Sequence, residues 1–109
     1  MINIEDFKKL ELKLGQILSV EKVPDTDKLL KLSVDMGEEQ PRTIVSGISE
    51  YFPDEQQLIN KKVMFVANLE PRTIRGIESQ GMILALSTEE GGFSLLSPIN
   101  DLPAGTKAR

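Results

Sequence analysis

The sequence predicts an all-β fold with short helices, arranged as a small Greek-key β-barrel. Several short segments alternate apolar and polar residues, as strands with one buried face do, and glycine, proline or aspartate residues separate them. A helical segment is expected between the third and fourth strands. With 109 residues the chain can bury one compact core but is short for two, so we expect a single domain over residues 1–109.

The chain is expected to begin with a short helix and a long strand. Asn3 is suited to cap a helix that runs to Leu10, with Asp6 at its third position. From Leu10 onward, apolar residues alternate with charged ones, which predicts a strand over residues 10–20. Gly15 lies inside this strand, so we expect a bulge or tight curvature at that point.

Two further strands follow a turn signal at residues 24–27. Residues 30–36 alternate regularly, which predicts a strand with one buried face and one solvent face. Residues 42–48 form the third predicted strand. Gly47, near its end, suggests that another part of the backbone approaches closely.

The second half of the chain is expected to contain a short helix, a fourth strand and a final hairpin. Pro53 is suited to the first turn of the helix. Residues 61–69 alternate as a strand, and residues 70–80 are predicted to be a polar connection. Residues 81–86 and 93–96 then pair as a hairpin around two glycines, before an irregular tail.

Composition restricts the chemistry that the chain can perform. It has no cysteine and no histidine, which excludes disulfides, cysteine-rich zinc sites and the usual nucleophile–base pairs. No segment is apolar over the length of a membrane helix, and the N-terminus lacks a secretory signal, so we expect a cytoplasmic protein that makes no membrane contact. The net charge of −4 means that any site for a polyanion must be local.

The best candidate for such a site is the segment around Arg72 and Arg75, which has little acid nearby. Pro71 makes the approach to this segment rigid, and Gly76 lets the backbone come close to a ligand. The alternative is that both arginines are solvated side chains on a loop. We therefore expect the basic surface of the barrel to lie at this segment.

A series of motifs, taken in order, is more specific than any one of them. The motifs are Leu12-Lys13-Leu14-Gly15, Asp27-Lys28-Leu29-Leu30, Arg42-Thr43-Ile44-Val45-Ser46-Gly47-Ile48, Val66-Ala67-Asn68-Leu69, Pro71-Arg72 and Arg75-Gly76-Ile77-Glu78-Ser79-Gln80-Gly81-Met82. Together they resemble the tRNA-binding domain family over nearly the whole chain. This family includes carboxy-terminal appendages of bacterial methionyl-tRNA synthetases and free-standing tRNA-binding proteins.

The resemblance implies an oligonucleotide/oligosaccharide-binding (OB) barrel that binds the outside of folded tRNA without catalysis or a cofactor. It also implies a homodimer, and possible action beside an aminoacyl-tRNA synthetase. The chain departs from the family in two places. Val23 stands where many members have histidine before the proline, and Thr73 stands where many have a basic residue after Pro-Arg. The second departure removes a positive charge from the expected site.

The resemblance and the charge pattern together give a set of expected tRNA-binding residues. These are Lys28, Arg42, Ser46, Asn68, Arg72, Arg75, Ser79 and Met82. The cations would contact phosphates, while Ser79 would donate a hydrogen bond and Met82 would add an apolar contact. The few aromatic residues mostly lie at positions expected in the core, which favours shape recognition of folded RNA over stacking of a single strand.

Structural alternatives exist for several of these residues. Lys28 could pair with an acidic residue of its own turn, and Arg42 could pair with Glu38 or Glu39. Asn68 interrupts an apolar strand face, so its side chain must either find hydrogen bonds inside the fold or face a ligand.

Two other functions compete with tRNA binding. Related barrels act as export-associated chaperones that bind peptides in the groove of a dimer, although the segments at residues 42–48 and 75–82 favour tRNA. A metal-dependent enzyme would have to use the oxygen ligands of Asp25, Asp27, Asp54 and Glu55. These carboxylates flank two separate turns without a known ligand spacing, so we expect no metal site and no catalytic residue.

Apolar residues gather at both ends of the chain, outside the barrel strands or at their margin. They are Ile2, Ile4 and Phe7 at the start and Leu95, Leu96, Ile99 and Leu102 near the end. We expect these N- and C-terminal extensions to form the homodimer interface. The alternative is that the tail folds back over its own barrel.

Overall fold

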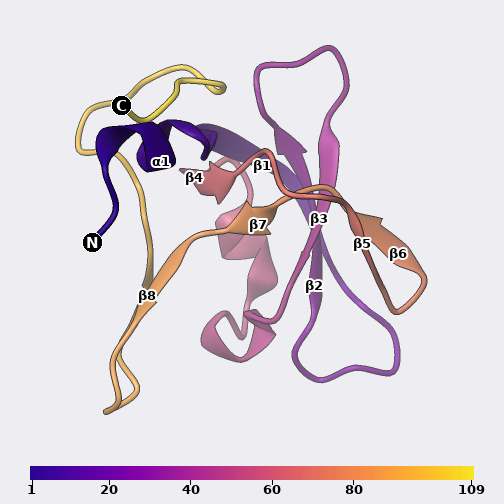
Figure 1. Cartoon of the computed structure of the whole chain (residues 1–109). Coiled ribbons are helices and arrows are strands. Elements are labelled where there is room, and N and C mark those ends of the chain that lie inside the picture. Colours follow the sequence, from indigo (N-terminus) through magenta and orange to yellow (C-terminus); the bar gives the residue numbers. More distant parts are fainter.

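The computed structural model describes all residues 1–109 and consists of one curved antiparallel sheet with two small hairpins (Figure 1). The five strands of the sheet are ordered β3-β2-β1-β4-β7. They are β1 (Leu12–Lys22), β2 (Leu30–Asp35), β3 (Arg42–Ser46), β4 (Lys62–Val66) and β7 (Met82–Ile83). The sheet curls into a nearly closed barrel, so the predicted OB-type fold is confirmed.

The interior of the barrel is filled by inward-facing side chains from the strands. The largest fully buried side chains are Phe65, Leu14, Ile17, Leu30, Leu32, Met36, Ile44 and Val34. Every second residue of β2 is buried, as its alternation predicts. Burial of one large apolar side chain contributes about 1.5–3 kcal/mol, so this cluster provides the main driving force for folding.

The β-bulge of β1 lies shortly after Gly15, where the sequence predicted a bulge or tight curvature, and does not include the glycine itself. The register between β1 and β2 shifts between Ile17 and Ser19. An added Cβ atom at Gly15 would lie 2.6 Å from Val34 Cγ1 and 2.7 Å from Phe65 Cε1. Gly15 is therefore required because core side chains pack directly against its backbone.

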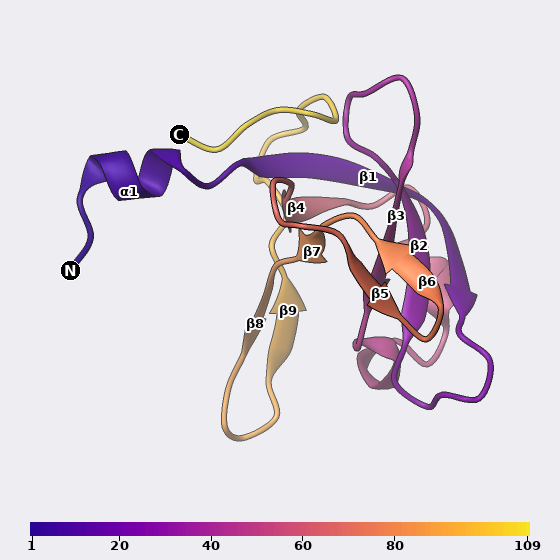
Figure 2. The same ribbon diagram turned by 45° about the vertical axis from the view of Figure 1, so that its right-hand side comes forward.

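The predicted N-terminal helix is present as α1 (Ile4–Lys8). The N–H of Asp6 donates to the Asn3 side chain at 3.0 Å, and the Asp6 carboxylate accepts from the Asn3 N–H at 3.4 Å. This capping box satisfies backbone groups that the short helix leaves unpaired. No residue of α1 is buried, and the helix projects from the barrel (Figure 2).

The helix expected from Pro53 is replaced by two 3₁₀ turns, one on each side of the proline. These are η1 (Ser49–Tyr51) and η2 (Glu55–Leu58). The Asp54 side chain caps the second turn, and Leu58 anchors that turn in the core. None of the helices has the length and apolar composition required to traverse a lipid bilayer.

Residues 70–80 contain a hairpin and are not the simple polar connection that the sequence predicted. Its strands are β5 (Arg72–Ile74) and β6 (Ile77–Ser79). Arg75 and Gly76 form the two-residue turn with φ angles of 52° and 79°. Positive φ at both positions is typical of a type I′ hairpin turn, for which glycine at the second position was an available signal.

The predicted final hairpin consists of β8 (Ala85–Ser87) and β9 (Phe93–Leu95), and it also projects from the barrel (Figure 2). The tail then returns to the beginning of β1. The Leu14 N–H donates to the Thr106 carbonyl at 2.8 Å, and the Gly105 N–H donates to the Leu14 carbonyl at 2.7 Å. The tail therefore folds back in part over its own barrel.

Replacing Gly15 with alanine is expected to destabilise the fold by about 1–3 kcal/mol, because the added methyl group overpacks the core. Urea denaturation followed by circular dichroism measures this change.

Gly47→Ala is the matched control. An added Cβ atom at Gly47 meets nothing within 4 Å, so the predicted close approach of backbone at this glycine is wrong. We expect this variant to stay within about 0.5 kcal/mol of the wild type. Equal losses in the two variants would contradict the packing role of Gly15.

Candidate nucleic-acid interface

The β1–β2 loop (residues 23–29) meets the β5–β6 hairpin at one side of the barrel. A hollow between them is lined by Asp25, Thr26, Asp27, Lys28, Leu29 and Arg75. The hairpin lies against β3, with β6 as its contacting strand (Figure 2). In OB barrels, two such loops flank the face of the second and third strands that presents side chains to an oligonucleotide.

The cations of this region are accessible. Arg72, Arg75 and Lys28 are exposed, and no carboxylate lies within ion-pair distance of any of them. Lys28 therefore does not pair with the acids of its own turn. Open space surrounds Gly76 at the tip of the hairpin, which leaves the turn free to approach a ligand.

Lys31 is a further cation on this side that was not among the residues predicted from the sequence. It lies on β2, opposite Glu21 of β1 and Val45 of β3. Like Lys28, it has no carboxylate within ion-pair distance. Its position between buried Leu30 and Leu32 was the signal that it faces solvent.

Ser79 lies inside the seam between β3 and β6 and is only 4% exposed. Its hydroxyl accepts a hydrogen bond from the Val45 N–H at 2.9 Å and donates to the Gly81 carbonyl at 3.3 Å. The next residue, Gln80, donates its N–H to the Thr43 carbonyl at 2.8 Å and accepts from the Thr43 N–H at 2.9 Å through its side chain. Ser79 and Gln80 therefore form hydrogen bonds with backbone groups on the free edge of β3, and these bonds help to close the barrel.

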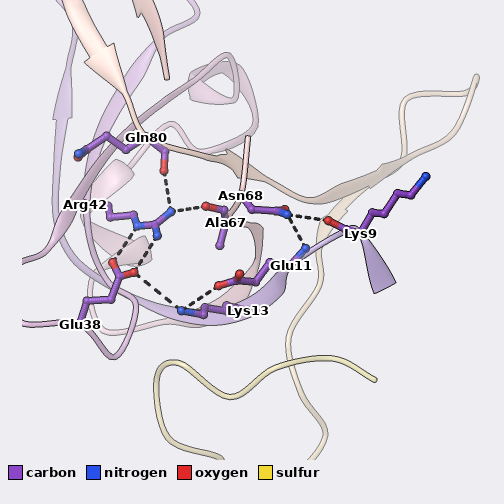
Figure 3. A network of polar contacts seen from close by, with 8 residues as sticks. All are labelled: Lys9, Glu11, Lys13, Glu38, Arg42, Ala67, Asn68 and Gln80. Atoms are coloured by element: carbon purple, nitrogen blue, oxygen red, sulfur yellow. Dashed lines mark hydrogen bonds and ion pairs between the residues drawn. The ribbon is translucent and has the colours of Figure 1, made fainter. Parts of the chain in front are cut away.

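Arg42 is held in a polar network at one end of this seam (Figure 3). Its Nε and Nη2 atoms donate to the two carboxylate oxygens of Glu38 at 2.8 and 2.7 Å. Its Nη1 atom donates to the backbone carbonyls of Ala67 and Gln80. Of the two acidic partners that the sequence left open, Glu38 is the one that pairs with Arg42.

The Arg42–Glu38 pair changes the ionisation of both groups. The hydrogen bond from Arg42 lowers the pKa of Glu38 below its ordinary value of 4.5, partial burial opposes this shift, and the positive charges of Arg42 and Lys13 reinforce it. The same hydrogen bond raises the pKa of Arg42. Both groups are therefore charged at neutral pH.

Asn68 supports the network from the other side (Figure 3). Its side-chain oxygen accepts from the Glu11 N–H at 2.8 Å, and its side-chain nitrogen donates to the Lys9 carbonyl at 2.6 Å. Asn68 thus joins the start of the β4–β7 connection to the segment between α1 and β1. Its hydrogen-bonding groups have partners within the protein although the residue is exposed.

Met82 and Ser46 do not line the hollow between the loop and the hairpin. Met82 is the first residue of β7, opposite Val66, and is 47% exposed. Ser46 is half-buried at the end of β3, opposite Leu30. The eight expected residues therefore divide into accessible cations, namely Lys28, Arg72 and Arg75, and residues built into or beside the barrel.

The acidic residues that a metal-dependent enzyme would use are not gathered at one place. No group of three or more acidic side chains is arranged so that it could hold a metal ion. Asp54 instead caps η2 by accepting from the Gln56 N–H at 3.2 Å, and Glu55 lies 4.0 Å from Lys22. Helix capping and surface charge pairing account for these two carboxylates.

Comparison with known families gives one match over most of the chain. The family model for the tRNA binding domain matches residues 12–107. Methionine–tRNA ligase from Deinococcus radiodurans is 48% identical over 109 residues, which is 100% of this chain and 16% of the ligase. The chain thus spans about a sixth of the length of the curated relatives that it matches.

Solved structures support the same grouping. A MetRS related protein from Pyrococcus horikoshii has a TM-score of 0.90 and 38% identity, with 100% of this chain and 98% of that chain covered. The chaperone CsaA from Bacillus anthracis has a TM-score of 0.87 and 30% identity, with 100% and 99% covered.

Replacing Glu38 with glutamine is expected to lower the free energy of unfolding by about 1 kcal/mol at neutral pH, because the charge-assisted pair with Arg42 is lost. The folded-state pKa of Glu38 is lowered, so its contribution is complete above the ordinary value of 4.5 and is lost as the pH falls through the lowered value. In urea denaturation, the gap between wild type and variant should be constant at neutral pH and narrow below about pH 4.

Glu39→Gln removes a neighbouring charge that makes no ion pair. Its small effect on stability should not follow the same pH dependence. A Glu38→Gln gap that remains unchanged down to about pH 3 would show that the Arg42–Glu38 pair does not stabilise the fold.

Proposed function

The chain belongs to the tRNA binding domain family, and on this premise we propose that it binds folded tRNA as a non-catalytic module. The proposed contacts are made by Lys28, Arg72 and Arg75, with Lys31 as a further cation on the same side. Cations without acidic partners are suited to phosphate oxygens, which supply most of the affinity of proteins for nucleic acids. Such contacts fix the position of an RNA but carry no base sequence, so we expect little preference among tRNAs.

The observation that best supports this proposal is the meeting of Lys28 and Arg75 around one hollow. These residues belong to different loops, and each lacks an ion-pair partner. The chain as a whole carries a net charge of −4, so long-range attraction to RNA is weak. Asp25 and Asp27 line the same hollow. Binding therefore depends on close contact between phosphates and the individual cations Lys28 and Arg75.

The aromatic residues support recognition of a folded RNA. Tyr51 and Phe93 stack with their ring centroids 3.9 Å apart, and Phe52 packs edge-on against Phe93. Phe65 is fully buried in the core. Proteins that bind single strands stack bases on free aromatic faces. The aromatic rings of this chain pack mainly against each other or into the core, which favours contacts to the shape and phosphates of folded tRNA.

We place this module in the cytoplasm, either free-standing or as an appendage of a methionyl-tRNA synthetase. The ligase relatives and the MetRS related structure support this proposal. In the appendage role the module would assist aminoacylation by holding the tRNA, while a separate catalytic domain performs the reaction. The module itself would need no metal or cofactor.

A chaperone-like role is the second candidate, because two solved CsaA structures have TM-scores of 0.87 with this chain. The molecule also has an open groove beside the stacked rings of Tyr51 and Phe93. Co-purification separates the candidates. Recovery of tRNA supports the main proposal, and recovery of unfolded polypeptide without tRNA would favour the second.

Replacing Arg72 and Arg75 together with alanine is expected to weaken tRNA binding about 10- to 100-fold and to reduce the slope of log affinity against log salt by up to about 2. The fold should persist, because exposed arginines contribute little to folding. Gel shifts over a salt series measure binding, and circular dichroism checks the fold.

Lys107→Ala combined with Arg109→Ala is the matched control, since it removes the same charge from the tail. We expect a smaller loss of affinity in this control. Unchanged binding in the Arg72 and Arg75 variant would remove the hairpin from the site. If an unstructured oligonucleotide of equal length competes for binding as well as tRNA does, the proposal that the protein recognises the folded shape of tRNA is wrong.

We also propose that the chain forms a homodimer through its N- and C-terminal extensions. Ile2, Ile4, Leu10, Ile99 and Leu102 are exposed apolar residues in these extensions. Although residues 105–108 pair with β1, this pairing does not cover them. Their burial across a two-fold axis would contribute roughly 25 cal/mol per Å² and would place two RNA sites on one particle.

Light scattering at micromolar concentration tests the dimer. We expect a mass near twice the 12.1 kDa of one chain. Ile99→Asp should shift this mass toward the monomer, because a charge in the interface opposes burial, while the circular dichroism spectrum remains unchanged. A wild-type mass of 12.1 kDa would contradict the proposal.

A further inference from the structure

We propose that Arg42 is a positioning residue that sets the orientation of the β5–β6 hairpin for RNA, and that it does not itself bind phosphate. The inference rests on the tRNA-binding function proposed above and explains how two of its contact residues are held in place. It concerns how Arg72 and Arg75 are oriented. The sequence had instead predicted that Arg42, like these two residues, contacts phosphate.

The two carbonyls that accept from Arg42 Nη1 lie at opposite ends of the β4–β7 connection. Ala67 directly follows β4, and Gln80 directly follows β6. Everything between them, including Arg72 and Arg75, is a single excursion from the barrel (Figure 2). Because one guanidinium nitrogen holds both ends, Arg42 restricts how the hairpin can swing relative to β3.

All three guanidinium nitrogens of Arg42 are already engaged within the protein. Nε and Nη2 bind the Glu38 carboxylate, and Nη1 binds the two carbonyls. The Arg42 side chain is only 20% exposed. Four of the five N–H groups of Arg42 are therefore used within the protein, and only one N–H of Nη2 remains for any further contact. We call Arg42 with Glu38 and the two carbonyls the Arg42 clamp.

Glu38 fixes the guanidinium from the side opposite the carbonyls (Figure 3). Lys13 in turn lies 3.8 Å from Glu38 and 3.1 Å from Glu11. The two possible roles of Arg42, positioning the hairpin or contacting phosphate directly, therefore predict opposite changes in RNA affinity when the Glu38 charge is removed. If Arg42 bound phosphate, the loss of a competing acid would strengthen RNA binding. If Arg42 positions the hairpin, the same change loosens the clamp and weakens binding.

The test compares the tRNA affinity of Glu38→Gln, Arg42→Lys and Glu39→Gln in the full chain. We expect the first two to weaken binding about 3- to 10-fold, because neither a neutral amide nor an ammonium group can maintain the fork between carboxylate and carbonyls. Glu39→Gln removes the same charge from the same turn without touching the clamp, and it should bind as tightly as the wild type or slightly tighter. Melting curves confirm that each variant is folded at the assay temperature.

A double-mutant cycle identifies the residues through which Arg42 acts. In a chain that already carries Arg72→Ala and Arg75→Ala, Glu38→Gln should have no further effect on affinity, because there are no hairpin arginines left to position. In a chain that carries Lys28→Ala, the effect of Glu38→Gln should persist. A tighter-binding Glu38→Gln variant, or additivity with the hairpin arginines, would overturn the proposal.

Amide hydrogen exchange tests the clamp without RNA. In Glu38→Gln, amides of β5 and β6 should exchange faster than in Glu39→Gln, while those in the centre of β1 and β2 remain protected. If wild type fails to bind tRNA but this difference is found, the proposed function fails and the clamp remains. Equal exchange in the two variants would overturn the clamp, whatever the RNA result.

Discussion

Closure of the barrel between β3 and β7 is the constraint on which the rest of the structure depends. β7 has only two residues, so it cannot supply a full ladder of hydrogen bonds to the edge of β3. The Ser79 hydroxyl and the Gln80 amide instead accept from the N–H groups of Val45 and Thr43. Arg42 completes the seam by donating to carbonyls on its other side. Side chains thus satisfy backbone groups that a longer strand would have paired.

This mode of closure links the stability of the barrel to the geometry of its basic surface. The hairpin with Arg72 and Arg75 starts and ends at the seam, so groups that close the seam also determine where the arginines lie. Gly81 belongs to the same arrangement: its φ angle is 148°, and an added Cβ atom would lie 3.0 Å from the Val66 carbonyl. The Ser79-Gln80-Gly81 motif is thereby explained by close backbone packing and hydrogen bonding.

Structural features could be predicted from the sequence where a local pattern of residues determines them. Alternation predicted the buried residues of β2, and Asn3 was correctly predicted as the N-cap of α1. Features could not be predicted where the residues in contact are far apart along the chain. The hydrogen bond from the Val45 N–H to Ser79 joins residues 34 positions apart, and no local signal distinguishes such a buried hydroxyl from one that faces RNA. The packing role of Gly15 was missed for the same reason, because the atoms around this glycine come from Val34 and Phe65.

Arginine side-chain NMR of the protein titrated with tRNA tests the central claim most directly. The Nε–H of Arg42 donates to Glu38, whereas those of Arg72 and Arg75 have no protein partner. We expect tRNA to shift the Nε–H signals of Arg72 and Arg75 and to protect these groups from exchange, while the signal of Arg42 stays nearly unchanged. A signal of Arg42 that shifts as far as theirs, with loss of its bond to Glu38, would contradict the account.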